Sequence, residues 1–225
     1  MLTRIYFTCV SPLENERLYR RLYTAASEER RQKTDRYRFL KDRMLSLGAE
    51  GLLLYALKKA GRGGKAISCR YGEHQKPYLS DADGFFFNLS HTGEYAMLAV
   101  SDAEVGCDVE KIRPVDPGLP EHVLTADERS VLTAAPKEER DALFFRYWVL
   151  KESCMKALGK GLLLDPKSFS ITLAPAIRAS GAGISEPLAF AEGALSDCRY
   201  AVCRFGEDIR IQTEIVPIEE ITGGI

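Results

Sequence analysis

Three carboxylates and one lysine lie in two short segments, at a spacing that could bind a metal ion beside a phosphate. Residues 105–110 alternate apolar and polar side chains as a β-strand does, so Asp108 and Glu110 would leave one face together. Glu152 and Lys156 are four residues apart, which makes them neighbours on one face of a helix. Oxygen ligands without His or Cys suit a hard cation such as Mg²⁺ or Mn²⁺, which takes further ligands from substrate phosphates. If the helix crosses the strand, Lys156 meets the same phosphate.

Each half of this pattern also has a commoner explanation. An Asp-x-Glu pair is frequent on solvent-facing strand edges, and Lys-Glu-x-x-x-Lys is an ordinary surface pairing on a helix. Taken separately, each segment is more simply explained as surface. The helical segment is strongly apolar around its charges, however, because it contains Phe144, Phe145, Tyr147 and Trp148. Charged residues on so apolar a helix favour a functional site.

The elements that must hold these residues follow from hydrophobic periodicity and from helix breakers. We expect a long helix over 138–158 that ends at Gly159, and a hairpin that places strand 105–110 beside a strand at 95–101. The capping box Thr125-x-x-Glu128 predicts a short helix near 125–132. Further predicted elements are a strand at 4–10, helical sequence over 14–57 with a long buried helix at 44–60, a weak strand at 66–70, a loop at 174–187, and strands at 85–89, 168–173, 187–191, 199–205 and 209–216.

The two halves of the chain are organised alike. Each contains one long buried helix followed by several strands, and residues 95–102 resemble residues 200–207. This pattern predicts an α+β fold with two similar α/β halves. We expect the boundary near residue 104, so that 1–104 form an N-terminal half and 105–225 a C-terminal half that carries the carboxylates.

The N-terminal half contributes polar residues at the ends of rigid segments. Pro77 fixes its own φ and biases Lys76 toward an extended conformation, so the lysine would project from a rigid turn. Ser90 and His91 end the predicted strand at 85–89, and a hydroxyl and an imidazole can both donate hydrogen bonds to phosphate oxygens. The commoner alternatives are a loop lysine and a histidine with a structural partner.

Positive charge is concentrated in one segment of the N-terminal half. Between Arg17 and Arg43 there are ten Lys or Arg residues against four Asp or Glu, although the whole chain has a net charge of −1. A charge run is usually a solvated helix face, but it also suits a polyanionic ligand. Arg30 and Lys33, three residues apart, would share one helix face. Nucleic acid is the weaker alternative, since the excess is confined to one segment that lacks interleaved aromatic residues.

Length and composition bound the class of protein. The 225 residues suit one large or two small domains, and a hydrophobic share of 45% supplies a sizeable core. The six cysteines include no C-x-x-C pair, which favours buried thiols in a reducing compartment over disulfides or zinc. The N-terminal apolar run is too short for a signal peptide, and no run approaches the ~20 apolar residues of a membrane helix. We therefore expect a cytoplasmic protein without a membrane segment.

Together the two segments resemble the paired signature of the 4′-phosphopantetheinyl transferases of the surfactin-synthetase type. That family has G-x-D-x-E followed by F/W-x-x-K-E-x-x-x-K; this chain has GCDVE at 106–110 and WVLKESCMK at 148–156. The NLSHTG of residues 88–93 is similar to the family's N-x-S-H-S/T-G, and Lys76-Pro77 to its G-K-P, with Gln75 in place of Gly. The resemblance covers nearly the whole chain and implies a pseudo-dimer with its site between the halves.

The resemblance implies an enzyme that transfers the 4′-phosphopantetheine group from coenzyme A to a serine hydroxyl of an acyl or peptidyl carrier protein. It implies Mg²⁺, or Mn²⁺, bound by Asp108, Glu110 and Glu152, with Glu152 and Lys156 as catalytic residues and the general base left open. The residues implied to contact coenzyme A are Arg30, Lys33, Arg43, Lys76, Pro77, Ser90, His91 and Lys156. Arg43 is only near the family's further arginine, whose expected place is closer to Leu45.

Two other functions fit parts of the same pattern. A metal-dependent pyrophosphatase would use acidic ligands and a phosphate-binding lysine to cleave a nucleotide with water. A coenzyme-binding module without turnover would need the basic segment alone, but the intact set of Asp108, Glu110, Glu152 and Lys156 counts against it. We expect no nucleic acid or membrane partner. A pseudo-dimer in one chain would make a monomer sufficient.

Overall fold

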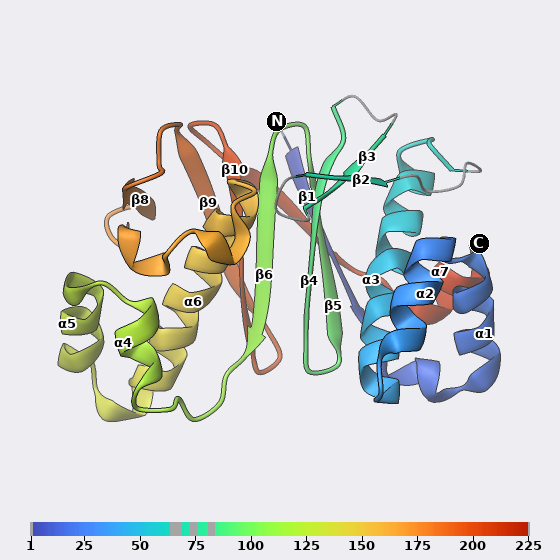
Figure 1. Cartoon of the computed structure of the whole chain (residues 1–225), viewed down its shortest axis with the longest axis horizontal. Coiled ribbons are helices and arrows are strands. Elements are labelled where there is room, and N and C mark those ends of the chain that lie inside the picture. Colours follow the sequence, from blue (N-terminus) through green and yellow to red (C-terminus); the bar gives the residue numbers. More distant parts are fainter. Residues whose placement is uncertain (1, 64–68, 73–75, 81–83, 225) are drawn as a thin grey trace.

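The computed structural model describes residues 2–63, 69–72, 76–80 and 84–224 (Figure 1). In the first half the elements are β1 (Leu2–Cys9), α1 (Glu16–Ala25), α2 (Glu28–Arg36), α3 (Leu40–Lys59), β2 (Cys69–Tyr71), β3 (Pro77–Leu79), β4 (Phe86–Thr92) and β5 (Tyr95–Ser101). In the second half they are β6 (Val105–Lys111), α4 (Leu119–Val123), α5 (Ala126–Ala134), α6 (Arg140–Ala157), β7 (Phe169–Thr172), β8 (Arg178–Gly181), β9 (Leu188–Leu195), β10 (Cys198–Phe205), β11 (Arg210–Ile215) and α7 (Ile218–Gly223). Short 3₁₀ helices lie at Ser11–Glu14, Lys137–Glu139, Gly161–Leu163 and Pro166–Ser168.

Two sheets form the middle of the molecule, with helices outside them. The order β11-β1-β5-β4 makes a four-stranded sheet, and β6-β10-β9 makes a three-stranded one. In Figure 1 the strands gather at the centre, with α4, α5 and α6 on one side and α1, α2, α3 and α7 on the other. Helices packed outside a mixed and an antiparallel sheet confirm the predicted α+β fold.

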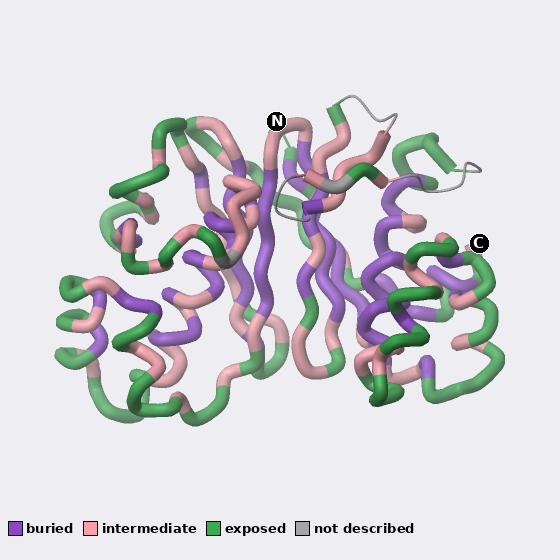
Figure 2. The backbone as a smooth tube through the Cα atoms, viewed as in Figure 1, coloured by how far each residue is buried: buried purple, intermediate pink, exposed green. Residues whose placement is uncertain are grey.

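Three apolar clusters hold these layers together. One lies between α3 and the four-stranded sheet, and a second between α6 and the three-stranded sheet. The third fills the space between the sheets, where Phe7 and Met97 from one sheet meet Cys107, Val109 and Val202 from the other. Figure 2 shows β6 buried along most of its length. The predicted alternation of strand 105–110 is confirmed in this respect, because its apolar side chains are fully buried on one face.

The last part of the chain departs from the division at residue 104. β11 pairs in parallel with β1, from Leu2 opposite Arg210 to Phe7 opposite Ile215. The following helix α7 packs its buried Ile218 and Ile221 into the cluster under α3. The chain therefore returns to the N-terminal half near residue 210, because the edge of β1 there is open to a further strand. The division at residue 104 stays a prediction.

Several boundaries also differ from the predicted ones. The strand expected at 85–89 continues to Thr92, since β4 and β5 stay in register as far as Thr92 opposite Tyr95. A tight turn at Gly93, with a φ of +58°, then reverses the chain. The loop expected at 174–187 contains β8, and Gln75 and residues 66–68 lie outside the described residues. None of the helices in the described ranges is long and apolar enough to cross a membrane.

Candidate active site

A glycine allows the helix with the candidate catalytic residues to lie directly against the strand with the candidate metal ligands. A Cβ atom added to Gly106 would lie 2.1 Å from the Ser153 carbonyl oxygen and 2.3 Å from the Ala157 nitrogen. No side chain fits at those distances, so the backbones of β6 and α6 touch at this position. The close approach brings the last two turns of α6 alongside Asp108 and Glu110. The glycine of the G-x-D-x-E motif thus has a packing function.

The predicted convergence of strand and helix is present in the structure. Lys156 Nζ lies 2.7 Å from Asp108 Oδ1 and also donates to Ser90 Oγ at 3.3 Å. Ser90 Oγ in turn donates to Asp108 Oδ1 at 2.8 Å. A pocket of about 320 Å³ opens over this cluster, lined by Leu89, Ser90, His91, Asp108, Glu110, Trp148, Glu152 and Lys156. Residues from β4, β6 and α6 therefore meet in one cavity, which we call the seam pocket.

The electrostatics of the seam pocket are dominated by carboxylates crowded together. Burial, and then the charge of Asp108, raise the pKa of Glu110. Burial also raises the pKa of Glu152, with Lys156 opposing this and Asp108 and Glu110 adding to it. Burial is the largest single influence on Lys156 and lowers its pKa, but the attraction of Asp108, Cys107 and Glu152 and the hydrogen bond to Asp108 together raise the pKa above its usual value. One ammonium thus faces three carboxylates, and an added cation would relieve the remaining repulsion.

The donor chemistry of the pocket fits a hard cation such as Mg²⁺. Asp108 is 4% exposed, and its Oδ2 is a buried oxygen without a hydrogen-bond partner in the described part of the chain. Such an orphaned carboxylate oxygen is costly unless something binds to it. Glu110 Oε2 is held by Thr92 Oγ1 and by Arg113 Nη1, both at 3.2 Å. Within the described residues, however, no three Asp, Glu, His or Cys side chains are gathered closely enough to hold a metal ion as they stand.

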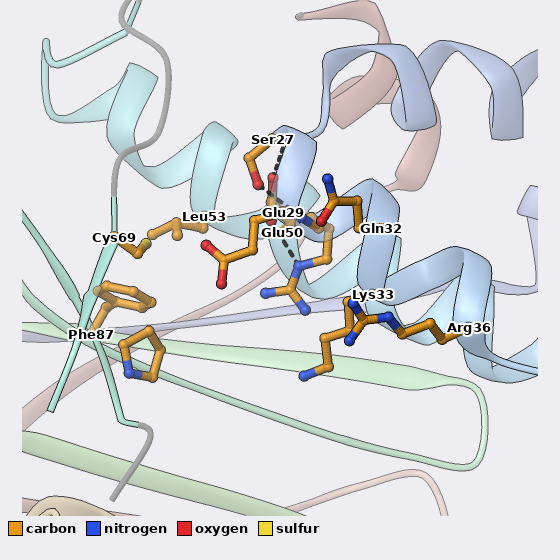
Figure 3. A pocket seen from close by; sticks show the side chains of 11 residues that line it. Ser27, Glu29, Gln32, Lys33, Arg36, Glu50, Leu53, Cys69 and Phe87 are labelled. Atoms are coloured by element: carbon orange, nitrogen blue, oxygen red, sulfur yellow. Dashed lines mark hydrogen bonds and ion pairs between the residues drawn. The ribbon is translucent and has the colours of Figure 1, made fainter. Parts of the chain in front are cut away.

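A second pocket, of about 500 Å³, lies along α2 in the N-terminal half (Figure 3). We call it the basic pocket, because Arg30, Lys33 and Arg36 line it from successive turns of α2. Its other lining residues are Ser27, Glu29, Gln32, Glu50, Leu53, Cys69, Pro77 and Phe87. Arg30 and Lys33 share a face of a helix, as predicted from their spacing. Arg36 continues that spacing by three further residues and could have been found from it.

The cations of the basic pocket are held differently. Arg30 Nε pairs with the buried Glu50 Oε2 at 2.7 Å, and its Nη1 donates to Ser46 Oγ at 3.4 Å. Lys33 forms no ion pair with another described residue. Lys33 is exposed overall, but partial desolvation by the surrounding protein lowers its pKa, and the charge of Arg30 lowers it further. The charge of Glu29 opposes this shift more weakly, so the charge of Lys33 is only partly balanced and an anion in the pocket would stabilise it.

His91 is influenced by cations of both pockets. It lines the seam pocket, and its ring is exposed on the surface. Partial desolvation lowers the pKa of His91, and the charges of Lys156 and Lys33 lower it further. A positive charge from each pocket thus acts on the same imidazole. An anion that spans both pockets would pass close to it.

Two predicted contacts have other partners in this structure. Lys76 lies outside both pocket linings; its buried Nζ pairs with Glu104 at 2.6 Å and donates to the Ala157 carbonyl oxygen at 3.2 Å. This ties the segment before β3 to the end of α6. Arg43 is likewise not among the residues that line the basic pocket, and its Nε donates to the Tyr37 carbonyl oxygen at 2.8 Å.

The lysine next to Glu152 has a structural place that the sequence pattern did not reveal. Lys151 is 1% exposed and pairs with Glu128, which is 2% exposed, at 2.9 Å. Lys151 Nζ also donates to the carbonyl oxygens of Pro166 and Phe169. Glu128 closes the predicted capping box at Thr125 and accepts from the Ile171 amide at 2.7 Å. The pair therefore joins α5, α6 and β7, and neither residue lines the seam pocket.

Known protein families match both halves of the chain. Residues 104–203 match the family described as the 4′-phosphopantetheinyl transferase superfamily, and residues 10–103 match the N-terminal part of 4′-phosphopantetheinyl transferases. The chain is 33% identical over 179 residues to 4′-phosphopantetheinyl transferase psf-1 of Bacillus pumilus, covering 76% of this chain and 75% of that protein. It is 31% identical over 165 residues to 4′-phosphopantetheinyl transferase Sfp of Bacillus subtilis, covering 73% and 72% respectively.

Two further similarities cover less than half of the chain. The chain is 41% identical over 92 residues to 4′-phosphopantetheinyl transferase AcpT of Salmonella typhimurium, covering 40% of this chain and 48% of that protein. The holo-[acyl-carrier-protein] synthase of Thermotoga maritima superposes with a TM-score of 0.40 and 17% identity, over 48% of this chain and 64% of that one. The resemblance seen in the motifs is confirmed by matches that span both halves: the chain belongs to the 4′-phosphopantetheinyl transferase superfamily.

Proposed function

We propose that this protein transfers the 4′-phosphopantetheine group from coenzyme A to a serine hydroxyl of an acyl or peptidyl carrier protein. The observation that carries the proposal is the pairing of Lys156 with Asp108 in a pocket formed by both halves of a chain of this family. In the reaction the serine oxygen forms a bond to the phosphorus that bears the pantetheine arm. The bond from that phosphorus to the bridging oxygen breaks, and adenosine bisphosphate leaves.

Coenzyme A would lie across the basic pocket and the seam pocket. Its ribose phosphate and its pyrophosphate are separate anionic groups, and the two pockets offer cations to both. Arg30, Lys33 and Arg36 suit the ribose phosphate, while Ser90, His91 and Lys156 suit the pyrophosphate. The influence of Lys156 and Lys33 on the pKa of His91, which itself lines the seam pocket, is consistent with this orientation. Lys76 and Arg43 are held by Glu104 and the Tyr37 carbonyl oxygen in this structure, and their contacts with the coenzyme stay predictions from the resemblance.

Asp108, Glu110 and Glu152 would hold Mg²⁺, or Mn²⁺ in its place, beside the pyrophosphate. The unpartnered Asp108 Oδ2 and the raised pKa values of Glu110 and Glu152 support this assignment. When bound, the ion would supply positive charge against the charge that develops on the pyrophosphate oxygens.

Lys156 would act on the same developing charge from the protein side. Its ammonium is fixed by Asp108 Oδ1, Ser90 Oγ and the Cys107 carbonyl oxygen, so it is already oriented before substrate binds. Glu152 is our candidate for the group that takes the serine proton, directly or through a water molecule, because it lines the pocket beside Lys156. Holding the serine hydroxyl in line with the leaving oxygen contributes much of the remaining acceleration.

We further propose that the protein works in the cytoplasm as a monomer. All six cysteines are free thiols, which suits a reducing compartment, and burial raises the pKa of Cys107 to about 12, so that thiol is inert. One chain already supplies both sides of the seam pocket. Neither a nucleic acid nor a membrane enters the proposed reaction.

The test is to mix the protein with apo carrier protein, coenzyme A and Mg²⁺ and to measure the mass of the carrier. A gain of one phosphopantetheine group is the expected result. Breakdown of the nucleotide without a change in the carrier would indicate a pyrophosphatase instead, and no reaction would leave a coenzyme-binding module. A parallel reaction in excess chelator should stop, and full turnover there would refute the metal site.

A further inference from the structure

The two halves meet along β4 and β6 through side chains, not through a backbone ladder. Asn88 Oδ1 accepts from the Cys107 amide at 2.9 Å, Ser90 Oγ from the Val109 amide at 3.4 Å, and Thr92 Oγ1 from the Lys111 amide at 3.3 Å. The three β4 side chains are two residues apart, as are the three β6 amides, so the strands run parallel and in constant register. β4 and β6 nevertheless belong to different sheets. We call these three contacts the side-chain ladder.

The ladder explains why the seam pocket is open where it is. Strands joined by backbone hydrogen bonds lie about 4.8 Å apart, and an interposed side chain must hold them further apart. The amides of β6 that face β4 need acceptors, because unpaired amides at a buried edge are costly. Asn, Ser and Thr supply those acceptors from side chains and so keep the halves separated. The same spacing leaves room for Ser90 to reach Asp108 and for Thr92 to reach Glu110.

We propose that Thr92 is a positioning residue for Glu110, and that the side-chain ladder aims the β6 carboxylates into the seam pocket. The proposal rests on the proposed function, since it gives Glu110 a place in the metal site. The Thr92 hydroxyl is placed to do this because it contacts both the Lys111 amide and Glu110 Oε2. Thr92 thereby fixes the strand on one side of Glu110 and the carboxylate itself.

The other group that holds Glu110 is less suited to orienting it. Arg113 Nη1 contacts the same Oε2 at 3.2 Å, but the Arg113 side chain is 56% exposed and that of Glu110 23%. Exposed ion pairs are screened and contribute little. Asp108 repels Glu110 and would turn it away. A hydroxyl on a strand that is itself paired to β5 as far as Thr92 provides the more rigid contact.

The test compares three variants of the full-length protein. Thr92→Val removes the hydroxyl and keeps the shape, whereas Thr92→Ser keeps the hydroxyl. Thr8→Val is the matched control, because Thr8 is a fully buried strand threonine of the same half whose hydroxyl has no partner among the described residues. Mn²⁺ binding is measured by electron paramagnetic resonance at saturating coenzyme A, with thermal unfolding and carrier modification measured alongside.

We expect Thr92→Val to bind Mn²⁺ about ten- to a hundredfold more weakly, as expected for the loss of one hydrogen bond to a charged group. Excess Mg²⁺ should recover its activity, and Thr92→Ser and Thr8→Val should bind as wild type does. Wild-type Mn²⁺ affinity in Thr92→Val would overturn the proposal, as would equal losses in the Val and Ser variants. If the wild-type protein binds Mn²⁺ but modifies no carrier, the proposed function is wrong, whereas the proposed role of Thr92 in positioning Glu110 still stands on the Mn²⁺ measurements.

Discussion

Replacing Lys151 by methionine should destabilise the protein without changing the chemistry of the folded molecule. Lys151 adjoins Glu152 in the K-E-x-x-x-K motif, yet it does not line the seam pocket and instead pairs with Glu128. Methionine keeps most of its apolar volume and removes the charge. Glu128 would then remain as a buried carboxylate without a counterion, although the amides of Thr125 and Ile171 would still donate to it.

The magnitude follows from the geometry of the pair. At 2.9 Å and an effective dielectric constant of about 20, the attraction between the two charges is about 6 kcal/mol. Much of this offsets the cost of burying them: burial lowers the pKa of Lys151 by more than Glu128 raises it. The pair thus contributes little relative to an apolar core, but removing one partner costs about 3–5 kcal/mol. For a chain of this size that lowers Tm by roughly 6–20 °C.

The assay combines thermal unfolding with carrier modification at low temperature. Lys137→Met, a substitution of an exposed lysine, is the matched control and should leave Tm unchanged. The double variant Lys151→Met with Glu128→Gln should recover part of the loss, since glutamine keeps the capping box and carries no charge. The reasoning is refuted if Lys151→Met unfolds with the wild-type Tm, or if it stays folded and loses turnover.

Three further predictions concern the two pockets. Lys33→Glu should raise KM for coenzyme A about tenfold and for dephospho-coenzyme A far less, because it reverses a cation placed for the ribose phosphate; equal effects on both would move it to the pyrophosphate. Coenzyme A should bind more tightly as pH falls from 8 to 6, because His91, whose pKa is lowered in the free protein, takes up a proton when phosphate binds. His91→Asn should remove that part of the dependence, and an unchanged profile would argue against the contact. Lys156→Ala should lower kcat more than it raises KM, since the ammonium is proposed to act in the transition state; an effect on KM alone would indicate uniform binding.

Local patterns in the sequence predicted the parts of the site that depend on one element each. Alternation set Asp108 and Glu110 on one face of β6, and the four-residue spacing set Glu152 and Lys156 on one face of α6. The sequence indicated a crossing of α6 over β6, but not at which residue. The crossing point is Gly106, where only the absence of a side chain lets the backbone of α6 approach. The G-x-D-x-E motif includes this glycine, but the sequence alone did not reveal its role in packing.

Contacts between distant segments were beyond the sequence patterns. β11 pairs with β1, which lies about two hundred residues earlier in the chain. The alternation of β11 predicts a strand but does not indicate which strand it pairs with. Lys151 and Glu128 lie on different helices, so neither the capping box nor the helical spacing connects them. Asn88 and Thr92 belong to the N-x-S-H-S/T-G pattern, from which only Ser90 and His91 were assigned a function. Their hydrogen bonds to β6 depend on how the two sheets meet.

The central claim is that the carboxylates and lysine of the seam pocket carry out the transfer, and Glu152→Gln tests it most directly. Glu152 lines the pocket, and the change keeps its size while removing the charge proposed to bind the cation and accept the serine proton. The measurement is the rate of carrier modification at saturating coenzyme A and Mg²⁺. We predict a fall of about a hundredfold or more at a Tm no lower than that of the wild type, because the change removes a buried charge that its neighbours repel. A rate within about twofold of wild type would contradict the account.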